Sequence, residues 1–527
     1  TGQIAQSKIF WLVLALKIFA SFFFASPVLL DLFIPFLEVF VAAPYSNVYE
    51  SFLYQAEDYN FPYPAAMLWG VSIPRLLLYS FGLHDLPINV LIFVYRIPLI
   101  FADIAILLIL CRWCRQRINT LLWLYWCSPV MFYITYLHGQ LDVLAMALAM
   151  LSIYFIFSKR WVKSAILLGL AVASKMHLLL LLPFFMIYFL QNDRQLRVSL
   201  PYIAISTAVF LVLNLPYMFG GSFLEIVLLN AQHGKVSLVT LGSNINGTAF
   251  QVIPALTLIL IFYAFYIQIR NRDIFLFFIG SAFGIILLFI PPAQGWYYWV
   301  LPFLVYFNAR QPYLLLLPFI ALQFFYLLYF AIIPSSDFGS LLYINPNPNH
   351  KNVDVVILYD WIVKMGIDGP STVGVFFTAL QTLLFINTIL MLYRGVHLLQ
   401  KNKLRSRPFM VGIAGDSASG KTMLAASIEA VLGSQRVGLT CGDDMHKWER
   451  GNIRWNGLTH LNPLANELHD ELDFIKQLRD NRRIWRRHYD HNTGQFTRKN
   501  AIEARSIMIM EGLHSFFFKP SRDLFYL

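Results

Sequence analysis

Long apolar runs follow one another over most of the chain. Between Lys8 and Tyr393 they repeatedly approach about 20 residues, the length that an α-helix needs to cross the hydrocarbon core of a membrane. After Lys401 charged residues become dense and the apolar runs become short. The pattern predicts a polytopic α-helical membrane protein with about 10–13 membrane helices, joined to a C-terminal α/β domain.

The same change in composition gives the expected domain boundaries. We expect a membrane-embedded domain over residues 1–398, a basic linker over 399–407 and an incomplete α/β domain over 408–527. The sequence lacks an initial Met and stops soon after Asp523, so we expect a processed or truncated chain. Hydrophobic residues make up 58% of the chain and charged residues 13%, which is far from the roughly 25% charged residues of soluble domains.

Charged residues predict the orientation of the membrane domain. The formal net charge of +11 lies largely in short clusters between apolar runs, where it indicates membrane topology rather than nucleic-acid binding. Between Asp31 and Pro74 the sequence has no Lys or Arg but five acidic residues, so this segment is predicted to face outside. The basic clusters and the C-terminal domain then face the cytoplasm. Four cysteines are too few for a disulfide framework.

Two apolar stretches are predicted to contain a break. The stretch from Ser164 to Leu190 has basic clusters on both sides, so it must enter and return as two shorter helices that meet near Lys175. The same reasoning for residues 64–110 favours a break at Pro74-Arg75. Irregular backbone at membrane depth is tolerated only where protein buries it or where it lines a cavity.

Charged residues at or within the predicted spans are candidates for chemistry. Arg96 and Asp103 lie seven residues apart on one helix face, and we interpret them first as groups that neutralise partners inside the helix bundle. Asp31 lies where the first span meets the outside segment. A carboxylate there suits a general base that deprotonates an acceptor hydroxyl, although an acid that merely orients the helix fits its position equally well.

Further polar groups interrupt apolar runs on the same predicted face. Lys175, at the expected helix break, is a candidate clamp for an anionic phosphate leaving group. For the run Gln294–Trp299 we favour an interfacial aromatic belt over stacking on sugar rings. The candidate ligands of a phosphate-bearing donor are Lys175, His138, Gln140, Asp142 and Arg96.

The order of these residues resembles the polytopic GT-C glycosyltransferases, in particular their mannosyltransferase-like branch. The resemblance covers about residues 8–400, and its motifs are Asp31 after the first span, Phe61-Pro-Tyr-Pro64, Arg96-x-Pro98 with Asp103, Ser128-Pro129, His138-Gly-Gln-x-Asp142, and Lys175 before Pro183. It implies a polyprenyl-phosphate sugar as donor, inversion at the sugar, and Asp31 as the base on the extracytoplasmic face. Because the first outside loop has no Asp-x-Asp, metal dependence and the sugar, a mannose-like hexose or a pentose, stay open.

The C-terminal segment contains a phosphate-binding loop between a predicted strand, Met410 to Ala414, and a predicted helix, Met423 to Leu432. Glycines in such a loop let backbone N–H groups surround phosphate oxygens at the helix N-terminus. Lys421 is expected to reach the β- and γ-phosphates of ATP, and Thr422 to ligate Mg²⁺. The loop consists of Gly415, Asp416, Ser417, Ala418, Ser419, Gly420, Lys421 and Thr422.

Two further predicted strands of this segment are followed by acidic residues. Residues 436–440 lead to Asp443, and residues 506–510 lead to Glu511. Ligands bind beside the carboxyl ends of strands in a parallel α/β sheet. Asp443 is therefore a candidate to deprotonate or orient an acceptor hydroxyl, and Glu511 a candidate to hold Mg²⁺ or its water.

These segments resemble the phosphoribulokinase/uridine kinase family over about residues 408–527. The motifs are Asp443-Asp-Met-His446-Lys-Trp-Glu-Arg450, Thr459-His460-Leu-Asn-Pro463, His488-Tyr489-Asp490-His491-x-Thr493-Gly494-x-Phe496-Thr497 and Ile509-Met-Glu511-Gly-Leu-His514. The resemblance implies ATP and Mg²⁺, Asp443 as base, and His446, Arg450 and Tyr489 near the acceptor. We expect the family's later strands and lid to be missing, which puts phosphotransfer in question.

The sequence thus favours an outer-face glycosyltransferase in the lipid bilayer with a cytoplasmic ATP-binding kinase-like domain. Two other functions stay open. One is a transporter or lipid flippase that nucleotide gates, and the other is a small-molecule kinase that the helices merely anchor. An anchor needs only one helix and no polar motifs on the far face, whereas a new glycosidic product or the flux of an unmodified solute would separate enzyme from transporter.

Overall fold

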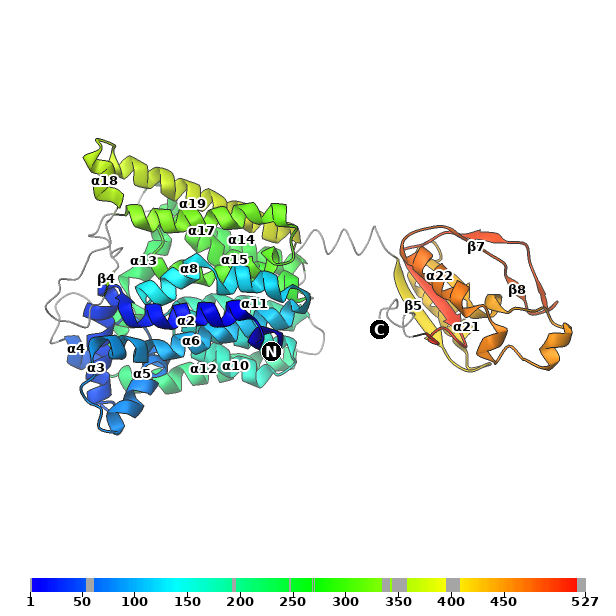
Figure 1. Cartoon of the computed structure of the whole chain (residues 1–527), viewed down its shortest axis with the longest axis horizontal. Coiled ribbons are helices and arrows are strands. Elements are labelled where there is room, and N and C mark those ends of the chain that lie inside the picture. Colours follow the sequence, from blue (N-terminus) through cyan, green and yellow to red (C-terminus); the bar gives the residue numbers. More distant parts are fainter. Residues whose placement is uncertain are drawn as a thin grey trace. The chain divides into compact units, whose positions relative to one another are not determined.

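The computed structural model divides the chain into two compact units, Thr1–Gly395 and Val396–Leu527 (Figure 1). It describes residues 2–53, 61–191, 196–245, 248–267, 269, 271–333, 342–343, 358–394 and 408–518. The predicted linker, residues 399–407, lies outside the described residues. Each unit is treated separately below.

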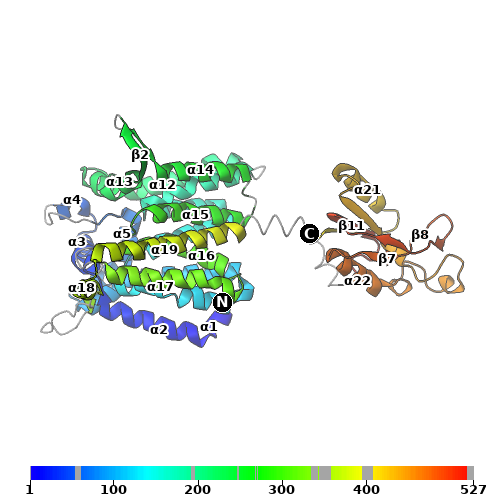
Figure 2. The ribbon, with the colours of Figure 1, turned by 90° about the horizontal axis from the view of Figure 1, so that it is seen from above.

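The first unit is a bundle of helices that run side by side (Figures 1 and 2). Its long helices are α2 (Lys8–Phe23), α5 (Ala65–Ser80), α6 (Ile88–Trp113), α9 (Asp142–Phe157), α10 (Trp161–Val172), α11 (Leu181–Gln191), α12 (Leu196–Asn214), α14 (Val252–Ile267), α15 (Arg272–Phe289), α17 (Leu317–Ile332) and α19 (Gly369–Leu392). The short helices α3 (Ile34–Ala42), α4 (Val48–Leu53) and α18 (Leu358–Lys364) gather at one end of this bundle.

Several helices of the first unit have the composition of membrane spans. Within the described ranges, four are long and apolar enough to cross a membrane, namely Ile88–Trp113, Arg197–Tyr217, Arg272–Phe289 and Gly369–Leu392. The pair Arg115–Trp126 and Pro129–His138, bent by 50°, would make a fifth span. Shorter apolar helices of 10–17 residues accompany them. The unit is therefore mostly helical and apolar, and the count of 10–13 membrane helices stays a prediction.

The predicted break near Lys175 is confirmed. Helix α10 ends at Val172, and Lys175 has extended backbone angles (φ −158°, ψ 118°) before a 3-10 turn, Met176–Leu180, leads into α11. The carbonyl oxygen of Ala173 accepts a hydrogen bond from the amide of Ala66, 2.9 Å away. A backbone group freed by the break is thus satisfied by another part of the bundle.

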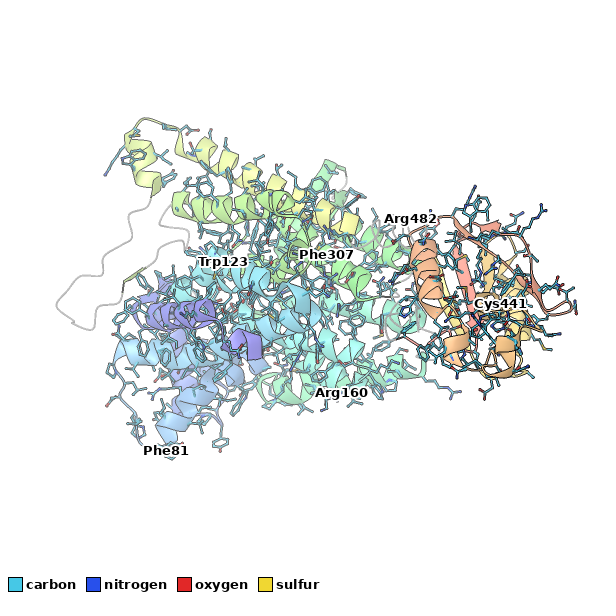
Figure 3. All side chains as sticks on the ribbon, turned by 45° about the vertical axis from the view of Figure 1, so that its right-hand side comes forward. Phe81, Trp123, Arg160, Phe307, Cys441 and Arg482 are labelled. Atoms are coloured by element: carbon cyan, nitrogen blue, oxygen red, sulfur yellow. The ribbon has the colours of Figure 1, made fainter. Side chains whose placement is uncertain are left out.

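The predicted break at Pro74-Arg75 is wrong. Pro74 lies inside α5, and the chain leaves the helix only at Phe81 (labelled in Figure 3), where Gly82 adopts φ 84°. Arg75 pairs with Glu38, Nη2 to Oε2 2.9 Å, and also donates to two carbonyl groups of the turn that follows α5. The guanidinium of Arg75 therefore stabilises the loop that follows α5. The helix itself continues through Pro74.

The second unit is built on a parallel sheet of three strands in the order β5-β11-β6. These are β5 (Phe409–Ala414), β6 (Val437–Cys441) and β11 (Ile507–Gly512), so the three predicted strands are confirmed. Helices α21 (Lys421–Leu432) and α22 (Leu468–Arg479) lie on opposite faces of the sheet (Figure 2). Successive side chains of β11 point to opposite faces of the sheet. Met508 and Met510 therefore pack with α22, while Ile509 packs against α21.

Two short antiparallel pairs complete the second unit. Strand β7 (Ile484–Arg486) pairs with β10 (Asn500–Ile502), and β8 (Tyr489–Asp490) pairs with β9 (Gln495–Phe496). Ile484 belongs to the core formed by α22 and the parallel sheet. One face of β7 therefore packs against this core. After β7 the chain continues directly into the β8–β9 hairpin.

Candidate functional site

Asp142 is the centre of a polar cluster in the first unit. It is the first residue of α9 and is fully buried, and its Oδ1 accepts hydrogen bonds from Lys175 Nζ and from Trp299 Nε1, the latter at 2.6 Å. Its Oδ2 is buried and has no hydrogen-bond partner in the described part of the chain. The Asp142 carboxylate at the N-terminus of α9 therefore holds Lys175 in place.

Lys175 is the member of this cluster that is accessible from outside the bundle. Its side chain is 16% exposed, and its ammonium lies 5.1 Å from the ring centre of Tyr63 and 5.2 Å from that of Trp299. His177 stacks on Trp299 with ring centres 3.8 Å apart. An ammonium has three donors, so a Lys175 that Asp142 holds retains N–H groups for an anionic oxygen.

His138 and Gln140 reach the same cluster from the end of another helix. His138 is buried, and its Nδ1 lies 3.2 Å from Nε2 of Gln140. The two residues flank Gly139, whose φ of 91° allows the chain to turn towards α9 and Asp142. Of the predicted donor-binding residues, Asp142 and Lys175 are thus brought together, and His138 and Gln140 contact each other just before Asp142 in the chain. Their role in binding stays a prediction.

Arg96 occupies a different environment from the one we expected. Its guanidinium is buried and Nη1 donates to the carbonyl oxygens of Ser21 and Phe24, at 3.2 and 2.7 Å, where α2 ends. No ion pair of Arg96 with an acid occurs among the described residues. In the described part of the chain Arg96 thus meets the negative potential of carbonyl groups at a helix C-terminus, and its neutralisation of a charged partner stays a prediction. Its role in donor binding stays a prediction.

Asp103 does neutralise a partner, as expected. Its Oδ2 lies 2.8 Å from Nζ of Lys17, and both side chains are only 1% exposed. The hydroxyls of Tyr136 and Tyr298 also donate to this carboxylate, at 2.6 and 3.1 Å. Nζ of Lys17 lies 3.3 Å from the ring centre of Trp126. This arrangement is a fully buried ion pair whose hydrogen-bonding capacity is largely satisfied.

Asp31 lies on a helical turn that contacts the Lys175 cluster. Its own side chain is exposed and it belongs to the π-helical segment Val28–Phe33. On the same segment, the ring of Phe33 lies 5.6 Å from that of Tyr63, which in turn covers Lys175. The segment that carries the exposed Asp31 therefore contacts the aromatic ring that covers Lys175. The role of Asp31 as base stays a prediction.

The interpretation of residues 294–299 as an interfacial aromatic belt is wrong. Tyr297, Tyr298 and Trp299 are buried, and they lie on a 3-10 helix, Gln294–Trp299. Trp299 donates to Asp142, and Tyr298 donates to Asp103. Belt residues present polar tips to the membrane surface, whereas these tips satisfy two carboxylates inside the bundle. The segment thus links the Lys175 cluster to the Lys17–Asp103 pair.

We predict that Gly295→Ala disturbs the Lys175 cluster. A Cβ at Gly295 would collide with Oδ2 of Asp142 and lie 2.9 Å from its Cγ, so the carboxylate or the 3-10 helix must move. Overpacking of this kind costs about 1–3 kcal/mol, and thermal unfolding of the detergent-solubilised chain measures it. Gly374→Ala is the matched control, because nothing lies within 4 Å of its added Cβ. Equal melting temperatures for the two variants would contradict the prediction.

The phosphate-binding loop of the second unit has the predicted strand–loop–helix form. Residues 415–420 connect β5 to α21, which begins at Lys421, and Ala418 and Gly420 adopt φ values of 63° and 83°. A Cβ at Gly415 would lie 2.8 Å from Oγ of Ser419, so the loop is too tight for a side chain there. These residues fit a nucleotide phosphate, because the loop exposes backbone N–H groups at a helix N-terminus. Nζ of Lys421 donates to the carbonyl oxygen of Asp416, 2.7 Å away.

A pocket beside the strand ends is lined by two of the predicted kinase-site residues, Asp443 and His446. It is partly open to solvent and is lined by Gly442, Asp443, His446, His460, Asn466, Leu468, Glu471, Leu513 and His514. The Asp443 side chain is 38% exposed and its Oδ2 lies 3.4 Å from Nε2 of His491. Burial lowers the pKa of His446, whose Nδ1 lies 2.7 Å from Oδ1 of Asn466. A neutral histidine therefore stands beside an accessible carboxylate.

Tyr489 and Arg450 come to this region through the β8–β9 hairpin. The ring centre of Tyr489 lies 5.0 Å from that of His446, and its hydroxyl is buried with no partner among the residues that the structure describes. The amide of Arg450 donates to the carbonyl oxygen of Gly494, 2.9 Å away. The structure therefore brings Asp443, His446 and Tyr489 together and ties Arg450 to the same hairpin. Their catalytic roles stay predictions.

Two acidic residues of this region were not recognised from the sequence. Asp444 is a structural residue, since its carboxylate accepts from Arg486 Nη2 (2.6 Å), His488 Nδ1 (2.9 Å) and the amide of Tyr489 (2.8 Å). Glu471 lies on α22 and lines the pocket, and burial raises its pKa to about 7. The sequence signal for Asp444 was its place directly after Asp443. Glu471 lies on the buried face of α22 with Leu468, Ile475 and Leu478, so its signal was an acid at an apolar position of the helical repeat.

Glu511 lies at the end of β11, as predicted. The residue is buried, and its Oε2 has no hydrogen-bond partner within the described ranges. Thr422 is exposed at the first turn of α21. Mg²⁺ usually binds through one or two protein ligands together with substrate phosphates and water. Among the described residues, no group of three or more His, Cys, Asp or Glu side chains is placed to hold a metal ion.

Comparisons with known proteins match two separate segments. Residues 410–527 match the model of the Phosphoribulokinase / Uridine kinase family, and residues 76–191 match that of the Alpha-(1->6)-mannopyranosyltransferase, N-terminal domain. A phosphoribulokinase of Synechocystis sp. is 30% identical over 118 residues, which is 22% of this chain and 36% of the relative. The chloroplastic phosphoribulokinase of Mesembryanthemum crystallinum is 27% identical over 136 residues, or 23% and 34% of the two chains. That of Triticum aestivum is 25% identical over 147 residues, or 25% and 36%.

These matches describe a fusion of a mannosyltransferase-like segment with a phosphoribulokinase/uridine kinase-like domain. The chain spans about a third of the length of the curated relatives that it matches. Both matched segments point to a transferase, and the kinase-like domain implies ATP and Mg²⁺. The first match includes Lys175 and Asp142, and the second includes the phosphate-binding loop and Asp443.

Proposed function

We propose that the first unit is a membrane glycosyltransferase of the GT-C type, and that the second unit binds ATP and Mg²⁺ in the cytoplasm. The glycosyltransferase moves a sugar, with inversion, from a polyprenyl-phosphate donor to an acceptor on the extracytoplasmic face. The observation that supports it most is the pair of Lys175 with the buried Asp142. The partly exposed ammonium of Lys175 lies one aromatic ring away from the segment that carries Asp31. The membrane domain then comprises residues 1–398, and the α/β domain residues 408–527.

Each group of the first site has a place in this reaction. The acceptor oxygen attacks the anomeric carbon, the bond from that carbon to the phosphate oxygen breaks, and the phosphate leaves with the bonding electrons. Lys175 stabilises the charge that develops on the leaving phosphate, and Asp142 holds and orients the ammonium. Exposed Asp31 accepts the proton of the acceptor hydroxyl.

In the second unit the chain's own residues supply the parts of a phosphate-binding site. The loop 415–422 holds the nucleotide phosphates, and Lys421 exchanges the carbonyl oxygen of Asp416 for a phosphate oxygen. Thr422 and Glu511 are the proposed Mg²⁺ ligands. Bound Mg²⁺ neutralises phosphate charge, while Asp443 deprotonates or orients an acceptor hydroxyl beside His446, Arg450 and Tyr489.

We expect Asp31→Asn to lower sugar transfer at least about 100-fold, the usual contribution of a general base, and to leave nucleotide binding unchanged. The assay uses the full chain in vesicles, radiolabelled polyprenyl-phosphate sugars and an extract of candidate acceptors. Asp85→Asn is the matched control, because Asp85 is also an exposed acid in the first unit. Unchanged transfer by Asp31→Asn would contradict the proposal. ATP-dependent flux of an unmodified sugar, with no new glycosidic bond, would favour the transporter.

A further inference from the structure

The second unit carries a basic sheet face that its proposed site does not use. Residues along β7 alternate, so Ile484 and Arg486 are buried whereas Arg483, Trp485 and Arg487 are exposed. The register of β10 adds Ala501 opposite Trp485. We call this the basic face, and its members are Arg483, Trp485, Arg487, Lys499, Ala501 and Glu503.

The composition of the basic face is unusual for a surface that contacts only water. Trp485 is 58% exposed, although a large aromatic side chain usually gains by burial. Arg487 and Lys499 flank the paired residues on opposite strands, and like charges in such places oppose sheet formation. One ion pair of the face is internal, Arg483 with Glu503, and both side chains are more than half exposed. Arg482 (labelled in Figure 3) and Arg498 add two more exposed cations beside the face.

We propose that the basic face docks on the anionic lipid surface of the membrane in which the first unit lies. Tryptophan prefers the headgroup region of a bilayer, and clustered Lys and Arg residues bind anionic lipids. The flanking cations, which repel one another in water, then each meet lipid phosphates. The positive charge of the basic face therefore favours an anionic lipid surface as its partner. The inference rests on the proposed membrane location of the first unit, which keeps this lipid surface close to the second unit.

The length of the connecting segment is consistent with this docking. The segment 395–407 links Arg394 of the first unit to Pro408 of the second and contains Lys401, Lys403, Arg405 and Arg407. A chain of 13 residues spans at most about 45 Å, so the basic face is held at a high effective concentration near the membrane surface.

Docking would also affect the acceptor pocket, because β7 has functional residues on its other side. Buried Arg486 donates to the carboxylate of Asp444, which also accepts from the amide of Tyr489. Contact of the lipid surface with Trp485 and Arg487 thus restrains the strand that positions Tyr489. The membrane surface is in this way a positioning element for the proposed phosphate-transfer site.

Hydrogen–deuterium exchange of the full chain in vesicles tests the docking. With about 30% phosphatidylglycerol in phosphatidylcholine we expect amides of residues 482–502 to exchange at least about tenfold more slowly than in pure phosphatidylcholine. The protection should disappear at about 0.5 M salt and in the pair Arg487→Glu and Lys499→Glu. This pair again places two like charges beside the β7–β10 pairing, and the contact that it removes within the unit is that of Arg487 with the Phe496 ring, 4.4 Å from Cζ.

The pair Arg436→Glu and Arg454→Glu is the matched control, since both arginines are exposed, lie outside the basic face and change the net charge equally. We expect it to retain the protection. Equal exchange rates in the two lipid compositions would refute the docking. Equal loss of protection in the two double charge-reversal variants would refute it as well. Sugar transfer is measured in the same vesicles, so a failure of the proposed glycosyltransferase is seen separately from a failure of docking.

Discussion

Lys17→Met is expected to destabilise the first unit by about 3–5 kcal/mol, the usual cost of removing one partner of a buried ion pair. The Asp103 carboxylate would remain 1% exposed with two tyrosine hydroxyls but no cation, in a helix bundle that excludes water. The ammonium also loses its contact with the Trp126 ring, 3.3 Å from Nζ. Chemical unfolding of the detergent-solubilised chain, followed by near-ultraviolet circular dichroism of the buried aromatic residues, measures the change.

A second substitution separates the unpaired charge from the lost volume. In the double variant Lys17→Met with Asp103→Asn, no net charge is left inside the bundle, and we expect it to regain most of the lost stability. Lys476→Met is the control, because its ion pair with Asp473 is exposed and such pairs contribute about 0–1 kcal/mol. A single Lys17→Met variant as stable as the Lys476→Met control would show that the pair is not buried in solution.

Local patterns of the sequence predicted the parts of the structure that neighbouring residues determine. The break at Lys175 follows from two basic clusters that flank one apolar stretch, and the strand–loop–helix form of residues 409–432 follows from a glycine-rich motif between apolar runs. In both cases the signal and the structure lie within about 30 residues of each other. The same holds for the acids Asp443 and Glu511, which directly follow β6 and end β11.

Contacts between distant residues could not be predicted in this way. Lys17 and Asp103 are 86 residues apart, and only the packing of α2 against α6 makes them a pair. Tyr298 and Trp299 have the composition of an interfacial belt, yet their polar atoms bond to carboxylates 195 and 157 residues away. Pro74 did not break its helix, because Arg75 is bonded to Glu38 and to the turn after α5. Burial therefore decided these cases, and a single sequence does not reveal which face of an apolar helix is buried.

Glu471→Gln is expected to stabilise the second unit by up to about 3 kcal/mol at pH 8 and to have no effect at pH 4. Burial, together with the nearby Asp443, raises the pKa of Glu471 to about 7, while its usual value is 4.5. Between these values the folded state keeps a proton that the unfolded state has released. The stabilising contribution of Glu471 is therefore complete below pH 4.5 and is lost as the pH rises to about 7. Glutamine has nearly the same shape as glutamate but does not titrate. The Glu471→Gln variant therefore keeps its stability as the pH rises.

Exchange rates of the amides in α22 and β11, converted to opening free energies at each pH, measure the effect in the full chain. Asp473→Asn is the matched control, since Asp473 lies on the same helix with its side chain 65% exposed. Its effect should be small and nearly independent of pH, because solvent screens an exposed carboxylate. Equal opening free energies for wild type and Glu471→Gln from pH 4 to pH 8 would mean that Glu471 has a partner or solvent in solution. Stabilisation confined to high pH would instead identify Glu471 as a carboxyl that stays neutral below about pH 7, where it presents a hydrogen-bond donor in the acceptor pocket beside Asp443.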